Sequence, residues 1–156
     1  MKRLLIVGVV TLYAAVAAAQ QRAIEGLPIK LGDSIETVKA ALGTALEPEA
    51  YRSAAQRNAR TLRLKTKGIW VFFDQDGRAY NIRLDAPFDG NVGGVKIGQT
   101  RAALVEKLGK PAKVVKGVVL AGLTQYEPYL YYIDDLTTVR FDFDRDGEIE
   151  VIYIIK

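Results

Sequence analysis

The stretch that decides the fold reads Ile29-Lys30-Leu31-Gly32-Asp33-Ser34, and a close copy, Val95-Lys96-Ile97-Gly98-Gln99-Thr100, begins 66 residues later. At the same offset, Leu42-Gly43 is matched by Leu108-Gly109. Further along, Phe73-Asp74-Gln75-Asp76-Gly77 is matched by Phe143-Asp144-Arg145-Asp146-Gly147 at an offset of 70 residues, so the second copy is four residues longer in its middle. Because order and spacing agree at both ends, the chain is predicted to contain two tandem copies of one unit.

Each copy is predicted to open with a helix. Ser34 and Thr100 are good N-caps, because a hydroxyl can accept a hydrogen bond from the free N–H groups of the first turn. Gly43 and Gly109 stand where a helix commonly ends in a left-handed residue. Between caps and glycines, aliphatic residues share one helical face, and they are Ile35, Val38 and Leu42 in the first copy and Leu104 and Leu108 in the second.

Three strands are predicted to follow each helix. They span residues 61–65, 69–74 and 78–84 in the first copy and residues 129–133, 138–144 and 148–155 in the second. Short turns at Lys67-Gly68 and Asp76-Gly77 indicate that neighbouring strands pair as antiparallel hairpins. Residues 48–59 favour a second helix, residues 114–120 a strand or a loop, and residues 85–94 the joint between the copies.

Alternation along the strands separates two faces of the sheet. The core face beneath the helices is predicted to hold Val71, Phe73, Ile82, Leu84, Phe141, Phe143, Ile152 and Ile154. The opposite face then carries Trp70, Phe72, Arg83, Arg140, Asp142, Val151 and Tyr153. Tyr129 and Tyr131 are candidates for the same face, but the repeat does not fix their register.

The opposite face supplies the candidate binding site. An antiparallel face turned to solvent is normally polar, whereas Trp, Tyr and Arg are enriched at binding hot spots. We therefore identify Trp70, Phe72, Arg83, Arg140 and Tyr153 as candidate partner-binding residues. Two alternatives stay open: the copies pack on each other at this face, or the aromatic residues are there because they suit strands.

The repeat also carries a resemblance to a known family. A capped helix closed by Leu-Gly, followed by antiparallel strands with an Asp-x-Asp-Gly turn and duplicated in tandem, resembles the β-lactamase inhibitory protein fold. A single unit resembles the small lipoprotein of the outer-membrane barrel-assembly machine. The resemblance covers roughly residues 27–156 and implies an envelope protein that binds another protein on its sheet face. The chain has no Cys, whereas the inhibitor family uses disulfides and the lipoprotein needs a lipidated Cys.

These patterns predict an α+β protein of two tandem helix-plus-antiparallel-strand units, with the first unit at residues 20–90 and the second at 91–156. The two sheets are expected either to join side by side or to face each other. Oligomeric state is not predicted.

Composition argues against most chemistries. Without His or Cys, the usual nucleophile–base pairs cannot be built, and zinc and copper lose their common ligands. No phosphate-cradling glycine motif is present. We therefore predict that the chain is not an enzyme and expect no catalytic residues, no cofactor and no metal site.

The acidic turn near the end is the strongest metal candidate. Asp142, Asp144, Asp146 and Gly147 fit the first half of a calcium loop, but Tyr153 occupies the position of the closing glutamate. The flanks are predicted strands, not helices. We therefore interpret the turn as a hairpin whose Asp and Gly residues supply turn geometry.

Charge is unevenly distributed along the chain. A basic stretch covers residues 52–67, and an acidic one covers residues 134–150. They are interpreted as two solvated faces, with contact to a partner's acidic patch or to anionic lipid headgroups as alternatives.

Residues 1–19 have the features of a secretory leader. Met1-Lys2-Arg3 precedes an apolar run of 16 residues, which is shorter than the ~20 needed to span a bilayer, and Ala17-Ala18-Ala19 suits a cleavage site. Cleavage before Gln20 leaves 137 residues and lowers the net charge from +4 to +2, which does not indicate nucleic-acid binding. We expect a periplasmic or secreted protein with no stable membrane span after cleavage.

The sequence thus favours an exported protein-binding module that acts through an aromatic and basic sheet face, and the family resemblance implies an inhibitor or an immunity protein. The expected partner is another protein in the cell envelope or outside the cell. The alternative is an envelope assembly or structural accessory factor.

Export predicts a defined mature N-terminus. Because small residues end the apolar run, the chain recovered from periplasm or medium should start at Gln20 by intact-mass measurement. A full-length species confined to the cytoplasm would contradict this prediction.

Overall fold

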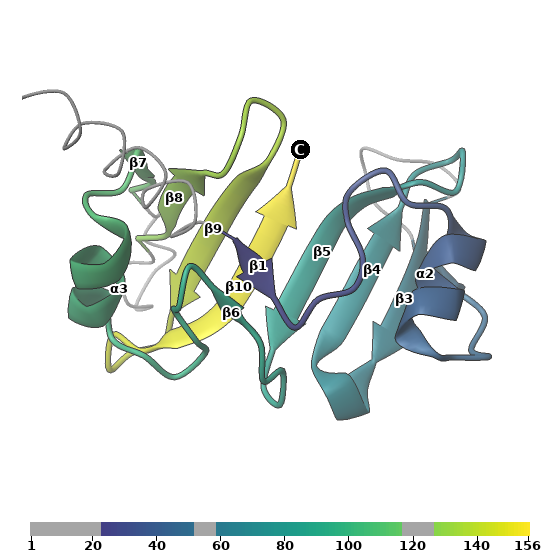
Figure 1. Ribbon diagram of the computed structural model, residues 1–156, viewed down its shortest axis with the longest axis horizontal. Helices are drawn as coiled ribbons and strands as arrows, with labels where there is room; N and C mark the ends of the chain where they lie inside the picture. The colour runs from purple at the N-terminus through teal and green to yellow at the C-terminus, as the bar shows by residue number, and fades with distance from the viewer. Residues whose placement is uncertain (1–22, 52–58, 117–126) are drawn as a thin grey trace, which may run out of the picture.

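The computed structural model describes residues 23–51, 59–116 and 127–156, and within them eight strands form one antiparallel sheet (Figure 1). Its strand order is β2-β3-β4-β5-β10-β9-β8-β7. The first half of the chain supplies β2 (Glu49–Tyr51), β3 (Ala59–Leu64), β4 (Ile69–Phe73) and β5 (Ala79–Asp85). The second half supplies β7 (Lys113–Val114), β8 (Tyr129–Tyr132), β9 (Thr138–Phe143) and β10 (Ile149–Ile155).

The prediction of an α+β protein built from two helix-plus-strand units is wrong, because the halves share one continuous sheet and the fold is mostly strand. The last strand of each half, β5 and β10, pair antiparallel at the centre. Leu84 lies opposite Ile152 and Ile82 opposite Ile154, so the apolar alternation of the two strands coincides. Of the two arrangements left open by the sequence, the sheets join side by side.

The helices α2 (Ile35–Leu42) and α3 (Arg101–Leu108) begin at the predicted caps. The Ser34 hydroxyl accepts from the Thr37 N–H at 3.2 Å, and the Thr100 hydroxyl accepts from the Ala103 N–H at 3.3 Å. All five aliphatic residues predicted for the helix cores are buried. Gly43 is left-handed as predicted, but Gly109 combines a φ of 77° with an extended ψ of −166°, so that second prediction is wrong. The extended chain there leads toward Pro111, and the Gly109 carbonyl accepts from the Tyr131 hydroxyl at 2.9 Å.

The repeat recurs as matching backbone contacts between each helix entry and its own hairpin. The Gly32 N–H donates to the Ala79 carbonyl at 2.7 Å, and the Gly98 N–H donates to the Ile149 carbonyl at 2.8 Å. In each half, the backbone N–H of the residue after the N-cap donates to the carbonyl of the glycine in the Asp-x-Asp-Gly turn. Ile35 donates to Gly77 at 3.2 Å, and Arg101 donates to Gly147 at 3.1 Å. The two halves therefore position their helices on their strands in the same way.

The core lies on the face of the sheet that carries the helices. Antiparallel pairing of β5 with β10 relates the halves by an approximate two-fold axis normal to the sheet, so both helices fall on the same face (Figure 1). The eight residues predicted for the core face are buried there with the helix residues, and they are Val71, Phe73, Ile82, Leu84, Phe141, Phe143, Ile152 and Ile154. We call this the inner face and the opposite one the outer face.

A two-stranded ribbon crosses the inner face between the helices. It pairs β1 (Ile24–Glu25) with β6 (Asn91–Val92), which belongs to the predicted joint. Val92 and Val95 are fully buried and belong to the common core. The ribbon therefore covers the central strands that neither helix reaches (Figure 1).

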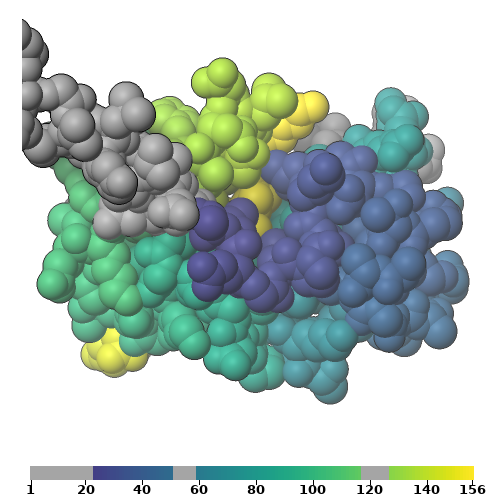
Figure 2. Space-filling view, viewed as in Figure 1, coloured from purple at the N-terminus to yellow at the C-terminus, as the bar shows by residue number. Residues whose placement is uncertain are grey.

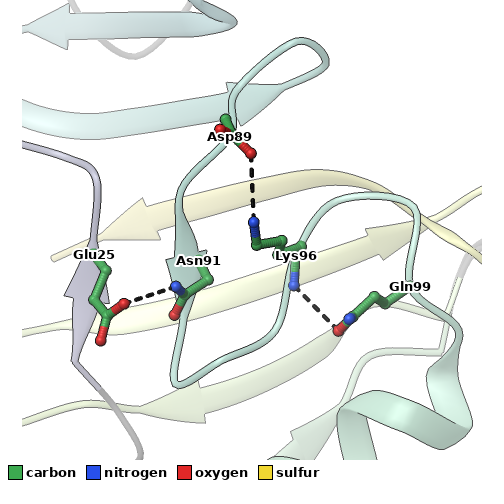
Figure 3. Close-up of polar contacts among 5 residues, drawn as sticks. All are labelled: Glu25, Asp89, Asn91, Lys96 and Gln99. Carbon is green, nitrogen blue, oxygen red and sulfur yellow. Dashed lines mark hydrogen bonds and ion pairs between the residues drawn. The ribbon is translucent and has the colours of Figure 1, made fainter.

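Side chains on the solvent-exposed side of the ribbon make polar contacts with one another and with the following loop (Figure 3). The Asn91 amide donates to Glu25 Oε2 at 2.9 Å, which ties β6 to β1. The Lys96 ammonium lies 3.4 Å from the Asp89 carboxylate, and the Lys96 N–H donates to Gln99 Oε1 at 3.2 Å. These contacts are solvent-exposed, so the buried valines beneath them carry most of the stabilisation.

Two local predictions fail where the chain joins the sheet edges. The helix predicted for residues 48–59 is wrong at its start, where Glu49–Tyr51 forms edge strand β2. Pairing with β3 outweighs the helix propensity of this short segment. Residues 52–58 of that prediction lie outside the described residues, as do residues 117–120 of the predicted strand or loop and the whole leader. In the described part of the chain, no helix combines the length and apolar character that a membrane crossing requires.

A glycine follows the short 3₁₀ helix η1 (Lys65–Lys67) at a tight backbone crossing. Gly68 has a φ of 63°, and a Cβ there would lie 2.0 Å from the Asp85 carbonyl oxygen and 2.6 Å from the Phe88 nitrogen. Gly43 has nearly the same φ, 62°, but nothing within 4 Å of its Cβ position.

Comparing alanine substitutions at Gly43 and Gly68 separates the cost of a left-handed backbone from the cost of a steric clash at the Cβ atom. Gly43→Ala should cost about 1–2 kcal/mol of unfolding free energy, because only the left-handed backbone is penalised. Gly68→Ala should cost clearly more, because backbone atoms of the β5–β6 connection must also move. Urea unfolding of both variants measures the difference, and equal losses would contradict the close crossing.

Candidate functional site: an arginine–aromatic row on the outer face

The outer face holds every residue predicted to bind a partner. Trp70, Phe72, Arg83, Arg140 and Tyr153 all occupy strand positions opposite to the buried core residues, and all five are half-buried. The alternation was thus predicted correctly, while partner binding by these residues stays a prediction.

Strand register brings four of the five into one line with a further arginine. Arg63 pairs with Trp70. Trp70 pairs with Arg83, Arg83 with Tyr153, and Tyr153 with Arg140. The arginine–aromatic row therefore takes one residue from each of β3, β4, β5, β10 and β9, and its members are Arg63, Trp70, Arg83, Tyr153 and Arg140.

Cation–π contacts fix the arginine side chains of the row against its aromatic rings. The guanidinium carbons of Arg63 and Arg83 lie 4.8 and 4.7 Å from the centroid of the Trp70 ring, so the indole is held by an arginine from each neighbouring strand. The guanidinium carbon of Arg140 lies 5.0 Å from the Tyr153 ring centroid. All three distances are within the ~6 Å range of an attractive cation–π contact. The long arginine side chains are consequently held close to the sheet.

Two of the three arginines also pair with carboxylates on their own strands. The Arg83 guanidinium lies 2.9 Å from Asp85, and Arg140 makes a bidentate pair with Asp142 at 2.6 and 2.5 Å. Residues two apart on a strand share a face, which explains both pairs. Arg63 is the row's exposed arginine and makes no ion pair with a carboxylate of the described residues.

Phe72 lies outside the row, in the next line of the sheet. It stands between Thr61 on β3 and Asn81 on β5, and its ring centroid is 6.5 Å from that of Tyr80. The hydroxyl of Thr61 and the amide oxygen of Asn81 are buried without a hydrogen-bond partner among the described residues. Phe72 therefore belongs to the same face but contributes an apolar contact beside the row.

The two tyrosines of uncertain register face the core. Tyr131 is 1% exposed and packs edge-on against Phe141, with ring centroids 5.7 Å apart. Tyr129 packs edge-on against Phe143 at 5.1 Å. The register that the sequence left open therefore excludes both from the outer face, because pairing of Leu130 with Arg140 makes Leu130 and Tyr132 the outward residues of β8.

Arg63 is the row member that sequence reasoning missed. It was assigned to a basic stretch and not to the site. The sequence feature that could have revealed Arg63 is the β3–β4 hairpin around Lys67-Gly68. Its turn contains η1, and this turn length places Arg63 directly opposite Trp70. The exact register of that turn was needed to find it.

The acidic hairpin has a structural role in both halves. Asp144 Oδ1 accepts from the backbone N–H groups of Asp146 and Glu148, each at 2.9 Å. Asp74 makes the matching pair of bonds in the first half. Asp142, which the calcium pattern placed first, is 5% exposed and committed to Arg140. The geometry agrees with a turn in which aspartate orders the backbone.

Comparison with known proteins bears on the fold. No protein-family model and no curated protein matches the chain. Among solved structures, the chain is similar to a DUF4309 family protein (YjgB) from Bacillus subtilis, with 20% sequence identity, a TM-score of 0.51 and 90% of each chain covered. At that identity the similarity concerns the fold alone. The resemblance to the β-lactamase inhibitory protein fold stays a prediction.

Truncating a side chain of β4 to alanine is predicted to affect the free energy of unfolding differently on the two faces of the strand. Phe73 is fully buried on the inner face, so Phe73→Ala should cost about 3–5 kcal/mol of unfolding free energy. Trp70 is half-buried and packed by two arginines, so Trp70→Ala should cost less than about 2 kcal/mol. Urea unfolding of the two variants is the measurement. A loss for Trp70→Ala as large as that for Phe73→Ala would place the indole in a core.

Proposed function

We propose that this chain is an exported protein-binding module that holds its partner with the arginine–aromatic row. The observation that carries the proposal is the row itself: two aromatic rings and three arginines aligned on adjacent strands, on the face opposite both helices. Trp, Tyr and Arg are the residue types that dominate binding hot spots. The export part rests on residues 1–19.

Preorganisation supports binding through this surface. Ordering an exposed arginine or aromatic side chain on binding costs about 0.5–1.5 kcal/mol each. Here the cation–π contacts and the carboxylate pairs hold Arg83 and Arg140 before any partner arrives. Their placement on strands, not on loops, keeps the spacing between binding groups fixed.

Charge determines the kind of partner we propose. Arg83 and Arg140 are each balanced by an aspartate, while Arg63 is not balanced by a carboxylate of the described residues. The row therefore has its uncompensated positive charge at the β3 end, beside the Trp70 ring. We propose a partner protein that presents a carboxylate to Arg63 and apolar side chains to Trp70, Phe72 and Tyr153. An inhibitor or an immunity protein would use such a surface to cover a partner's functional site.

The test compares two exposed arginines of the same strand. Arg63 lies in the row on the outer face, whereas Arg60 pairs with Phe73 and lies on the inner face of the sheet. The mature protein and its variants would be used to capture partners from envelope extract, identified by mass spectrometry, and the affinity for the purified partner would then be measured by calorimetry.

Trp70→Ala and Arg63→Gln should each weaken binding about 30-fold, as loss of ~2 kcal/mol at a hot spot implies, while Arg60→Gln should leave the affinity unchanged. Unfolding curves of the same variants control for loss of structure. A partner bound equally well by Trp70→Ala and by the parent chain would reject the row as the binding surface.

A further inference from the structure

A trough lies on the inner side, where the two halves of the chain meet. Its floor is Ile82 of β5 and Ile154 of β10, both buried. The rest of the lining comes from β1 with its flanking residues and from the β8–β9 hairpin, and its members are Ala23, Ile24, Leu27, Ile29, Lys30, Leu31, Ile133, Asp134 and Thr137. The trough has a volume of about 270 Å³. Figure 2 shows yellow atoms of the chain end between the light-green hairpin and the dark-blue segment.

A wider, charged recess continues from one end of the trough. It has a volume of about 630 Å³ and shares Lys30, Leu31, Asp134 and Thr137 with the trough. It adds Arg78 and Lys156 as cations and Asp74 as a further carboxylate. The aliphatic residues of the trough thus adjoin a recess that carries charged side chains among apolar ones, an arrangement that suits an amphiphile and not a uniformly polar ligand.

The carboxylates of the recess are already engaged by the backbone. Asp74 Oδ1 accepts from the N–H groups of Asp76 and Arg78 at 3.0 and 2.9 Å. Asp134 Oδ1 accepts from the Leu136 N–H at 2.8 Å, and this bond is the main reason that the pKa of Asp134 is lowered. Both groups therefore order their own turns.

The cationic side chains of the recess make fewer polar contacts than its carboxylates do. Lys30 and Lys156 make no ion pair with any described carboxylate, and the Arg78 guanidinium donates a long hydrogen bond of 3.5 Å to the Gly32 carbonyl. The recess consequently offers positive charge to a ligand at the mouth of an aliphatic trough.

We propose that this site binds an unbranched aliphatic carboxylate, such as a free fatty acid. The chain would lie along the aliphatic residues of the trough, whose described lining also includes Lys30, Asp134 and Thr137 but no aromatic ring. The carboxylate would meet Lys30 and Arg78 in the recess. The trough, at about 270 Å³, is slightly smaller than the ~300–1,000 Å³ typical of small-ligand pockets, and the recess, at about 630 Å³, falls within that range. This site is separate from the arginine–aromatic row, which is on the other face of the same sheet.

Calorimetric titration of the mature protein with decanoate, below its micelle concentration, tests the proposal. Decanol has the same chain without the charge, and decyltrimethylammonium has the opposite charge. Decanoate should bind at least about tenfold more tightly than either, because charge-assisted hydrogen bonds add to burial of the chain. Equal affinity for the three compounds would overturn the proposal.

Variants locate the binding. Lys30→Gln combined with Arg78→Gln should weaken decanoate about tenfold or more and leave decanol unchanged, while Lys110→Gln, an exposed lysine outside the site, should change neither. Thr137→Trp, which fills the trough, should abolish binding of both, with urea unfolding as the check on folding. Retained decanoate binding in a folded Thr137→Trp chain would reject the site.

Trp70→Ala separates this proposal from the protein-binding one. Trp70 lies on the outer face, so the variant should lose the partner and bind decanoate as before. Loss of decanoate binding in Trp70→Ala would assign the ligand to the outer face and overturn the trough.

Discussion

The pairing of β5 with β10 is the constraint on which the rest of the structure depends. Five consecutive residues of each strand face each other, from Val151 opposite Asp85 to Ile155 opposite Asn81. A slip of one residue would turn every side chain of one strand to the other face. Arg83 or Tyr153 would then enter the core, and a buried unpaired arginine costs several kcal/mol. The aliphatic residues on the inner face thus fix the register that the outer face uses.

The same pairing explains how the sheet ends. Each half would have exposed its longest strand, seven residues in both β5 and β10, as an unpaired edge. Joining the two moves the edges outward to β2 and β7, which have three and two residues. Long unprotected edges are sites of aggregation, and very short edge strands are one way that proteins avoid it. The eight-stranded sheet is therefore a better solution than two separate units.

Sequence predicted what depends on local pattern and missed what depends on distant pairing. N-caps at Ser34 and Thr100, the two Asp-x-Asp-Gly turns and the alternation of Trp70 against Phe73 are encoded within a few residues, and all were found. The joining of the halves was left open, because β5 and β10 are adjacent in the sheet but about 70 residues apart in sequence.

The errors at Tyr129, Tyr131 and Arg63 have a related cause. Tyr129 and Tyr131 sit on a strand that the repeat does not align, so their register came only from pairing with β9. Arg63 was overlooked because its partner Trp70 is found only after the turn through η1 is counted correctly. Alternation thus placed four of the five row members on the outer face, but Arg63 and the linear arrangement of the row required the register of four strand pairs.

One strand pair consequently supplies both candidate surfaces. On the outer face, Arg83 of the first half meets Tyr153 of the second, which joins the Trp70 end of the row to the Arg140 end. One residue further along, on the inner face, Ile82 meets Ile154 and forms the trough floor. Neither surface exists within a single half. Loosening the β5–β10 pairing should therefore disturb both surfaces together, whereas a side-chain change on one face acts on that face alone, because the close-packed sheet between them keeps its backbone fixed.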